Sequence, residues 1–284
     1  MRIKKILGNS VVHAILAILS FVWVMPIVFA LLTSFRGEPG SVKTYIIPKQ
    51  FTLANYTGLF NVGVGGLTYA RWFTNTLVVA IISCVLSGFF ILSVSYALSR
   101  MRFRMRKPFM NLALILGMFP GFMSMIAVYY ILKGFGFLET GMSSLFALTL
   151  VYSGGAGLGF YITKGFFDTI PKSLDEAAYL DGCTNWEVFT KITLPLSKPI
   201  AVYTLIVSFM GPWTDFIFAR VILGQNREYY TIAIGLWTML EREFIETYYT
   251  QFFAGCVLIS IPISILFLMT QRFYTSVMGG AVKG

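Results

Sequence analysis

Asp215 is an acidic residue placed well inside an apolar stretch of the sequence, and the aromatic residues Trp213 and Phe216 lie beside it. An ionised carboxylate is costly in hydrocarbon, so it is expected to face a helix-bundle interior, a water-filled cavity or a partner charge. The two rings can stack on the apolar face of a sugar or fill space between helices. These three residues are candidates for lining a solute pathway, with a structural role as the alternative. Arg220 is five residues from Asp215, which is off the spacing of a good intrahelical pair.

A second group of candidate residues lies in a polar segment, residues 164–199, that interrupts the apolar chain. Ser173, with Glu176 three residues later, has the spacing of a capping box, which starts a helix. Gly182 can end that helix, because glycine takes the left-handed conformation at little cost. The pattern predicts a short helix between the two signals.

Ala177 and Ala178 give this short helix little side-chain bulk, so its surface is suited to insertion into a groove on another protein. Thr184 and Glu187 repeat the capping-box spacing and predict a second helix, which Pro195 is expected to close. The segment is therefore predicted to be a helix, a tight turn and a helix.

The sequence contains no recognisable set of catalytic or metal-binding residues. It has no Ser/His/Asp set and no catalytic carboxylate pair within one segment. The glycine-rich run 154–159 lies in an apolar stretch and lacks the lysine of a phosphate-binding loop. Cys84, Cys183 and Cys256 have no metal-ligand spacing, and the single histidine, His13, is expected to pack. The chain is predicted not to be an enzyme and to bind no metal or cofactor itself.

Composition indicates a protein surrounded by lipid. Hydrophobic residues make up 57% of the 284 residues and charged residues only 12%, with a mean hydropathy of +0.75. A soluble domain carries about 25% charged residues. The net charge of +10 is better explained by basic cytoplasmic loops than by binding of nucleic acid, which is not expected.

The predicted fold is an all-α integral membrane protein, because backbone groups must be satisfied within lipid and no strand-length alternation suggests a barrel. The first apolar run is too long for a signal peptide and is expected to remain as a span. Each predicted span is long enough to cross a hydrocarbon core of about 30 Å. The six predicted transmembrane helices are 11–33, 72–98, 109–132, 143–163, 200–223 and 251–272.

The distribution of Lys and Arg predicts the orientation. The basic cluster at 100–107 is short and abuts two spans, so it is expected in the cytoplasm. Both termini and the polar segment 164–199 then lie on the same side. The segments 34–71, 133–142 and 224–250 are expected outside.

The last outer segment carries Glu241, Glu243 and Glu246, which either contact an external partner or form a solvated loop. Pro120-Gly121, Gly211-Pro212 and Pro262 interrupt spans. Such breaks are expected to be kinks or close-packing sites, with backbone exposure to a solute path as the alternative.

The polar segment resembles the signature loop of the inner-membrane permease subunits of binding-protein-dependent ABC importers. The match is complete over Glu176-Ala177-Ala178-x3-Gly182-x9-Ile192-x-Leu194-Pro195. Residues 165–171, residues 96–100 with the basic loop that follows, and the six-span layout are also similar to the family. The ending, 279–284, resembles the tail of the maltose-type second permease subunit. The resemblance covers residues 70–284 well.

The resemblance implies a bacterial inner-membrane transport subunit and favours a different chain as its partner, the second permease subunit. Two ATPase subunits would bind ATP and Mg²⁺, and an external sugar-binding protein would deliver substrate. Residues 240–250 resemble the loop that reaches into the binding protein, and 276–284 the tail that enters the ATPase interface. The residues implied at the ATPase contact are Ser173, Glu176, Ala177, Ala178, Asp181 and Gly182.

The resemblance implies an oligosaccharide substrate, such as a maltodextrin or a galacto-oligosaccharide, with a non-sugar solute as an alternative because other importers share the signature loop. The resemblance implies that residues 173–182 form the coupling helix, through which transport by alternating access would be driven. The rival hypothesis is an ion-coupled secondary transporter that uses Asp215 as its ion site. The predicted organisation is a first helix with an outer loop (1–70), a transmembrane domain (71–273) and a cytoplasmic tail (274–284).

Overall fold

The computed structural model describes residues 2–41, 43–61, 68–154 and 157–281, with side chains between 12 and 271 except those of 157 and 158. Helices dominate, and the β-structure among these residues is an isolated bridge between Arg36 and Phe51. Four helices are long and apolar enough to cross a membrane, or up to six if each of two bent pairs is one span. The prediction of an all-α membrane fold is confirmed.

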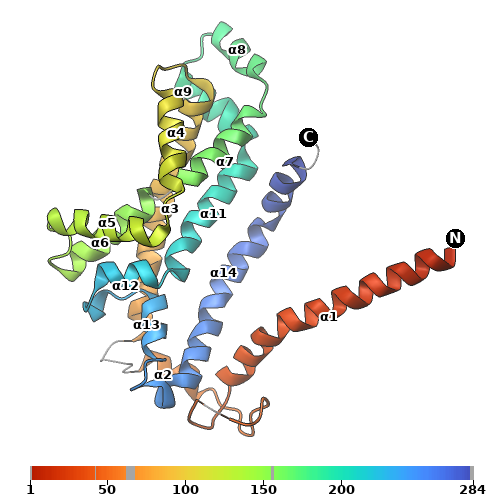
Figure 1. Ribbon diagram of the computed structural model, residues 1–284, viewed down its shortest axis with the longest axis vertical. Coiled ribbons are helices and arrows are strands. Elements are labelled where there is room, and N and C mark those ends of the chain that lie inside the picture. The colour runs from red at the N-terminus through yellow and green to blue at the C-terminus, as the bar shows by residue number, and fades with distance from the viewer. Residues whose placement is uncertain (1, 42, 62–67, 155–156, 282–284) are drawn as a thin grey trace. The chain divides into compact units, whose positions relative to one another are not determined.

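The chain divides into two compact units, Met1–Ala70 with Gly235–Ile261, and Arg71–Ile234 with Pro262–Gly284. The first unit contains α1 (Arg2–Ser34), α2 (Ala54–Phe60) and the beginning of α14 (Ile245–Ala281) (Figure 1).

Buried Asn55 joins α1, α2 and α14 in the first unit. Its amide donates to the carbonyl oxygens of Ser34 (2.9 Å) and Arg36 (2.8 Å), and its carbonyl accepts from Thr250 Oγ1 (2.8 Å). Three hydrogen bonds from one side chain therefore fix the end of α1 and the start of α14 against α2.

The second unit is built around α3 (Tyr69–Arg100). Around it lie α4 (Arg106–Gly117), α5 (Gly121–Gly134), α6 (Gly141–Gly154) and α7 (Gly157–Asp168). Later elements are α8 (Lys172–Leu180), α9 (Asn185–Glu187), the π-helix Val188–Thr193 and α10 (Leu194–Leu196). The last are α11 (Lys198–Thr214), α12 (Ile217–Leu223), the 3-10 turn Arg227–Tyr229 and the start of α13 (Ile232–Thr238), whose residues from Gly235 on belong to the first unit.

A stripe of buried serines holds α3 in the second unit. The serines recur at four-residue intervals apart from one apolar step, which places them on one face of the helix. They contact α6, α11 and α7 in turn, as hydroxyl groups between membrane helices commonly do. The hydrogen bonds are Ser83 to Thr149 O (3.3 Å), Ser87 with Ser208 Oγ (3.1 Å), Ser95 to Phe160 O (3.1 Å) and Ser99 to Asp168 Oδ1 (2.6 Å).

The other end of α3 is also fixed by polar contacts. The buried amide of Asn75 donates to the carbonyl oxygens of Glu228 (2.9 Å) and Tyr230 (3.1 Å). A Cβ added at Gly88 would lie 2.5 Å from Leu205 Cδ2, so the absence of a side chain lets α3 and α11 approach closely.

Two predicted spans are not the continuous helices that the hydropathy pattern suggested. The span 109–132 is α4 and α5, which are bent by 105° at the break that contains Pro120. The span 200–223 is α11 and α12, separated at Asp215 and Phe216. Proline lacks an N–H and disrupts the helical hydrogen bonds, yet α14 continues through Pro262. The hydropathy of the sequence shows how long an apolar segment is, but it does not show where the helix bends.

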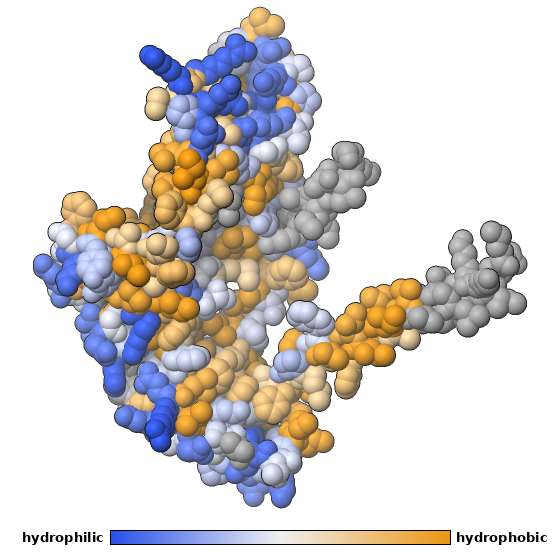
Figure 2. Space-filling model, in the orientation of Figure 1, coloured by the Kyte–Doolittle hydropathy of each residue, from blue (hydrophilic) through white to orange (hydrophobic). Residues whose placement is uncertain are grey.

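Surface polarity distinguishes parts of the molecule. Hydrophilic residues gather over α8 and α9, whereas the described part of α1 is apolar (Figure 2). Between Val12 and Ser34, none of the residues in the most apolar stretch of α1 is buried against the rest of the chain. This pattern agrees with lipid around α1 and water around α8.

Candidate functional site

The first turn of α8 differs from the predicted capping box. Pro171 (φ −57°, ψ 129°) precedes the helix, which begins at Lys172, and no side chain caps it. Ser173 therefore lies inside the helix rather than at its start, and the prediction was wrong. Proline holds the extended conformation that a cap residue needs, and the chain enters the helix directly after it.

The C-terminus of α8 is formed as the sequence predicts. Gly182 has a φ of +83°, which favours glycine. Its N–H donates to Tyr179 O (3.1 Å) and that of Cys183 to Ala178 O (2.9 Å), which is the Schellman arrangement. The helix ends in a tight turn that directs the chain toward α9.

Gly182→Ala is expected to destabilise this turn by roughly 1–2 kcal/mol, because an L-residue is strained in the left-handed conformation. Gly165→Ala is the matched control. Gly165 lies in α7, and a Cβ there meets nothing within 4 Å, so that helix should keep or gain stability. Hydrogen–deuterium exchange of residues 172–183 measures the effect. Equal protection of this segment in the two variants would contradict it.

The second predicted helix is confirmed at its start. Thr184 accepts from the Glu187 N–H (3.3 Å), and Glu187 accepts from the Thr184 N–H (2.9 Å) in a capping box. Hydrogen bonds from Lys191 and Thr184 lower the pKa of Glu187 to about 2. Pro195 does not close the helix as predicted, because it lies in the final turn, α10. The wide turns of the π-helix before it accommodate a residue without an N–H.

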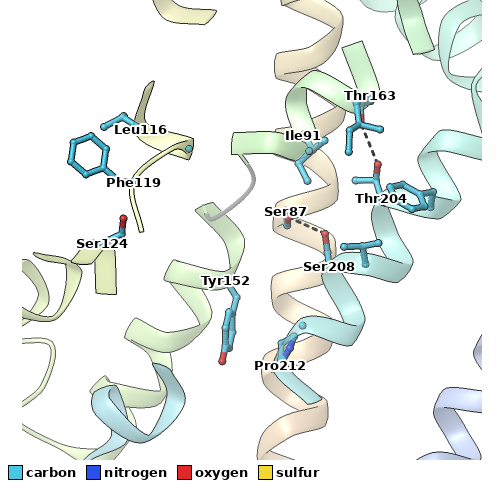
Figure 3. Close-up of a pocket in the computed structure, with 16 residues that line it drawn as sticks. Ser87, Ile91, Leu116, Phe119, Ser124, Tyr152, Thr163, Thr204, Ser208 and Pro212 are labelled. Atoms are coloured by element: carbon cyan, nitrogen blue, oxygen red, sulfur yellow. Dashed lines mark hydrogen bonds between the residues drawn. The ribbon is translucent and has the colours of Figure 1, made fainter. Parts of the chain in front are cut away.

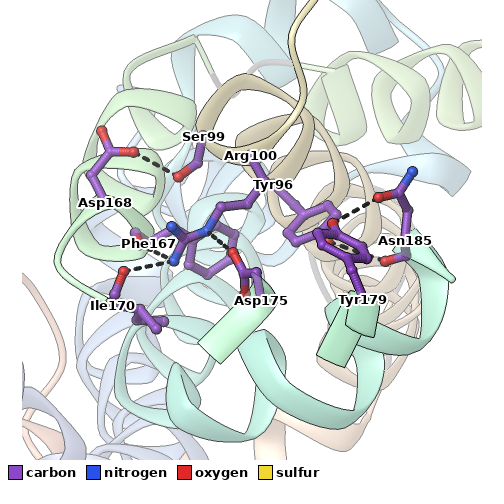
Figure 4. Close-up of polar contacts among 9 residues, drawn as sticks. All are labelled: Tyr96, Ser99, Arg100, Phe167, Asp168, Ile170, Asp175, Tyr179 and Asn185. Atoms are coloured by element: carbon purple, nitrogen blue, oxygen red, sulfur yellow. Dashed lines mark hydrogen bonds and ion pairs between the residues drawn. The ribbon is translucent and has the colours of Figure 1, made fainter. Parts of the chain in front are cut away.

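A buried ion pair attaches α8 to the end of α3 (Figure 4). Arg100 Nε lies 3.1 Å from Asp175 Oδ2, and the two side chains are 3% and 7% exposed. Arg100 Nη2 also donates to the carbonyl oxygens of Phe167 and Ile170, both at 2.9 Å. One guanidinium thus binds α8 and the turn that leads into it. Burial raises the pKa of Asp175, while the positive charge of Arg100 opposes the rise.

Aromatic packing supports the same attachment. Tyr96, one turn before Arg100, donates to Asn185 O (3.1 Å) and packs against Phe189 with ring centroids 4.8 Å apart. Tyr179 donates to Asn185 Oδ1 (2.8 Å), which joins α8 to α9. A buried cluster lies beneath: Leu92, Tyr96, Phe167, Ala178, Val188, Phe189 and Ile200. The α8–α9 segment is therefore attached to the end of α3 by both polar and apolar contacts.

The outward face of α8 is exposed and partly apolar. Glu176, Ala177, Asp181 and Gly182 are exposed, and Leu180 has 90% of its surface accessible. Ala178 was predicted to lie on this surface but is buried in the cluster under α8. Leu174, Tyr179 and Trp186 in the same segment are also exposed, at 42%, 42% and 62%, and a group of large exposed apolar side chains, unlike a single one, is a feature of a docking surface.

A cavity of about 530 Å³ lies within the second unit, among α3, α7 and α11 (Figure 3). Hydroxyl groups and apolar side chains line it, and none of its lining residues is charged. Two hydroxyl pairs occupy its wall, Ser87 with Ser208 (3.1 Å) and Thr163 with Thr204 (3.3 Å). Each hydroxyl can donate and accept, so such a wall suits a neutral polyhydroxyl solute.

Asp215 lies in the break between α11 and α12. Tyr152, which lines the cavity, donates to Asp215 Oδ2 (2.7 Å), and the Phe218 N–H donates to Oδ1 (3.0 Å). Phe216 occupies the N-cap position of α12, and the carboxylate of Asp215, one residue earlier, binds an N–H in the first turn of that helix. Trp213 is 3% exposed and packs against Phe73 and Phe209 at 5.1 Å and 5.8 Å between centroids. The lining of this cavity does not include these three candidates, but Asp215 and Tyr152 both line a second cavity of about 570 Å³.

The outer glutamates differ in environment. Glu246 binds the Ser41 N–H (3.1 Å) and its hydroxyl, which ties α14 to the segment after α1. Glu243 is exposed, and Glu241 is half-buried. Side chains beyond Gln271 and residues 282–284 lie outside the described residues, so the role of the tail 276–284 stays a prediction.

Sequence reasoning missed the residues that hold the site together. Arg100 was counted as a loop charge and Asp175 was not singled out, although both side chains are buried. The serine spacing on α3 was a usable signal, because small hydroxyl residues at four-residue intervals mark a helix-packing face. The pairing of Arg100 with Asp175 has no local sequence signal.

Comparisons with known proteins identify the family of the chain. The family model described as "Binding-protein-dependent transport system inner membrane component" matches residues 90–277. The galactooligosaccharides transport system permease protein of Bacillus subtilis (strain 168) is 33% identical, and the alignment covers 100% of this chain and 99% of that protein. The maltodextrin transport system permease protein of Streptococcus pneumoniae (strain ATCC BAA-255 / R6) is 32% identical, and the alignment covers 100% of this chain and 98% of that protein.

A solved structure has the same fold. A chain of a bacterial ABC transporter involved in the import of the acidic polysaccharide alginate aligns with a TM-score of 0.81 and 21% identity, covering 96% of this chain and 98% of that one. The resemblance of the signature loop is thus supported by the whole length of the sequence and by the fold. The chain belongs to the family of binding-protein-dependent transport system inner membrane components, the multi-pass permeases of ABC importers.

Proposed function

We propose that the chain is one permease subunit of an ATP-driven importer of oligosaccharides, and that α8 docks on a partner ATPase subunit. The exposed face of α8, rigidly attached to α3, carries this proposal. ATP and Mg²⁺ are bound by the ATPase subunits, and this chain contributes no catalytic group. The proposal places α8 and both termini in the cytoplasm, as the basic cluster at 100–107 favours.

Attachment of α8 to α3 supports transmission of force from the ATPase. Arg100 and Asp175 are buried, and the Schellman turn fixes the far end of α8. A displaced α8 carries the end of α3 with it, because packed elements shift as units rather than deform. The membrane helices then alternate between inward-open and outward-open arrangements around a cavity.

A sugar substrate is supported by two observations. The relatives above are permeases for galactooligosaccharides and maltodextrin. The cavity bears hydroxyl pairs and aromatic rings, such as Tyr203 and Phe119, and no charge among its lining residues. Neutral sugars need hydrogen-bonding groups and flat apolar surfaces, and both are present there. A second permease completes the pathway, and a sugar-binding protein docks outside near 240–250.

The rival assignment of Asp215 as an ion site is disfavoured by its contacts. Both carboxylate oxygens accept hydrogen bonds from the chain itself, at Tyr152 and the Phe218 N–H. This geometry is that of a helix cap at a break.

Proteoliposomes with the complete importer test the proposal. Uptake of labelled maltodextrin or galactooligosaccharide should require ATP and binding protein, and collapse of the ion gradients should leave it unchanged. Asp215→Asn should keep most of the uptake, because an amide oxygen can still accept from the Phe218 N–H. Uptake driven by an ion gradient without ATP would refute the ATP-driven assignment. ATP-driven uptake of a labelled amino acid but no sugar would refute the substrate class alone.

A further inference from the structure

The segment that joins α3 to α4 alternates apolar and basic side chains. Met101, Phe103 and Met105 are 37%, 45% and 61% exposed, and Arg102 and Arg104 between them are also exposed. An orientation signal requires the basic residues but not the exposed apolar residues between them. The combination is typical of a chain segment at the boundary between lipid headgroups and acyl chains.

The basic side chains surround a hollow. A cavity of about 580 Å³ is lined by Arg102, Phe103, Arg104, Arg106, Lys107 and Pro108. Four cations around one hollow repel each other unless an anion occupies it.

This chain supplies little negative charge to the hollow. The sequence has no Asp or Glu between Glu38 and Glu139. The ion pairs found in the described part of the chain do not include the four cations of the hollow. Asp168, which Arg106 attracts, is already bound by Lys164 and by Ser99 Oγ at 2.6 Å. The positive charge of the hollow is therefore available to bind an anion from outside this chain.

The position of the segment selects the kind of anion. It starts directly after Arg100, the last residue of a membrane-spanning helix, and leads into α4, the first member of a bent apolar pair. We propose that residues 101–107 bind the anionic headgroup of a membrane phospholipid. Arginine guanidinium groups donate paired hydrogen bonds to the phosphate, and the three apolar side chains contact the upper acyl chains.

A lipid bound at residues 101–107 would affect α8 through Arg100. Arg100 adjoins the segment and holds Asp175 and the carbonyl oxygens of Phe167 and Ile170. A lipid that orders residues 101–107 restricts the backbone from which Arg100 projects. The headgroup is thereby linked to the position of α8.

Lipid retention by the purified importer tests the proposal. The complex is reconstituted in nanodiscs of phosphatidylcholine mixed with phosphatidylglycerol and then transferred to detergent, and its retained lipids are measured by native mass spectrometry. The parent should retain phosphatidylglycerol in preference to phosphatidylcholine. Each neutralised cation should lower this preference about fivefold, so Arg102→Gln with Arg104→Gln and Lys107→Gln should abolish it.

Two further variants keep the test decisive. Arg227→Gln, an exposed arginine elsewhere in the same unit, should retain the lipid like the parent. Arg104→Gln alone alters the orientation signal least and should still lower the preference about fivefold. Unchanged retention in the inserted variants refutes the site. Retained lipid with loss of the ATPase subunits would identify the hollow as a protein interface and equally refute it.

Discussion

Replacing Arg100 by methionine is expected to abolish uptake and to destabilise the protein by about 3–5 kcal/mol, the cost of leaving a buried charge without its partner. The substitution leaves Asp175 buried and removes the donor from the carbonyl oxygens of Phe167 and Ile170. Thermal unfolding of the purified importer and ATP-driven uptake measure the two effects.

Two matched variants separate the lost pair from the lost charge. Arg227→Met removes an exposed arginine and should change stability little. Arg100→Met combined with Asp175→Leu removes both charges and should recover part of the stability, because apolar replacements of a buried pair are often tolerated. Equal stability of Arg100→Met and Arg227→Met would show that the ion pair does not hold α8.

Leu180→Asp is expected to separate the permease from its ATPase without unfolding it. Leu180 is 90% exposed, so its replacement removes little packing within the chain. At the centre of an interface, a lost apolar anchor costs about 2 kcal/mol or more, which is about a 30-fold loss of affinity. Co-purification of the ATPase and sugar uptake should both fall while the melting temperature stays unchanged.

Leu180→Met keeps the apolar contact and should keep both activities. Leu53→Asp makes the same exchange at a leucine that is 66% exposed, before α2, and should leave ATPase binding intact. Normal co-purification of the Leu180→Asp variant would exclude this face of α8 as the docking surface.

The parts of the site that sequence could predict depend on neighbouring residues. The Thr184–Glu187 capping box and the turn at Gly182 follow from spacings of a few residues, and both are confirmed. Ser173 had a valid spacing too, but Pro171 set the start of the helix first. A local pattern fails where a stronger backbone constraint lies beside it.

The remaining features depend on how distant helices meet. Ala178 faces inward because Tyr96 and Phe189 pack there, and helix propensity carries no information about that choice of face. Arg100 and Asp175 pair across two helices that are far apart in the sequence. The break at Asp215 was signalled by the nearby proline, whereas its hydrogen bond with Tyr152 required the fold.

The length of α3 has a thermodynamic consequence. Its 32 residues extend about 48 Å, from near the Asn75 contacts to the Arg100 contacts. Suppose a ligand or protein at the Asn75 end favours one position of the helix. If a protein bound to α8 at the Arg100 end also distinguishes the two positions, the two bindings are coupled. Because binding linkage is reciprocal, the factor by which the first partner changes the affinity of α8 for the second must equal the factor by which the second changes the affinity for the first.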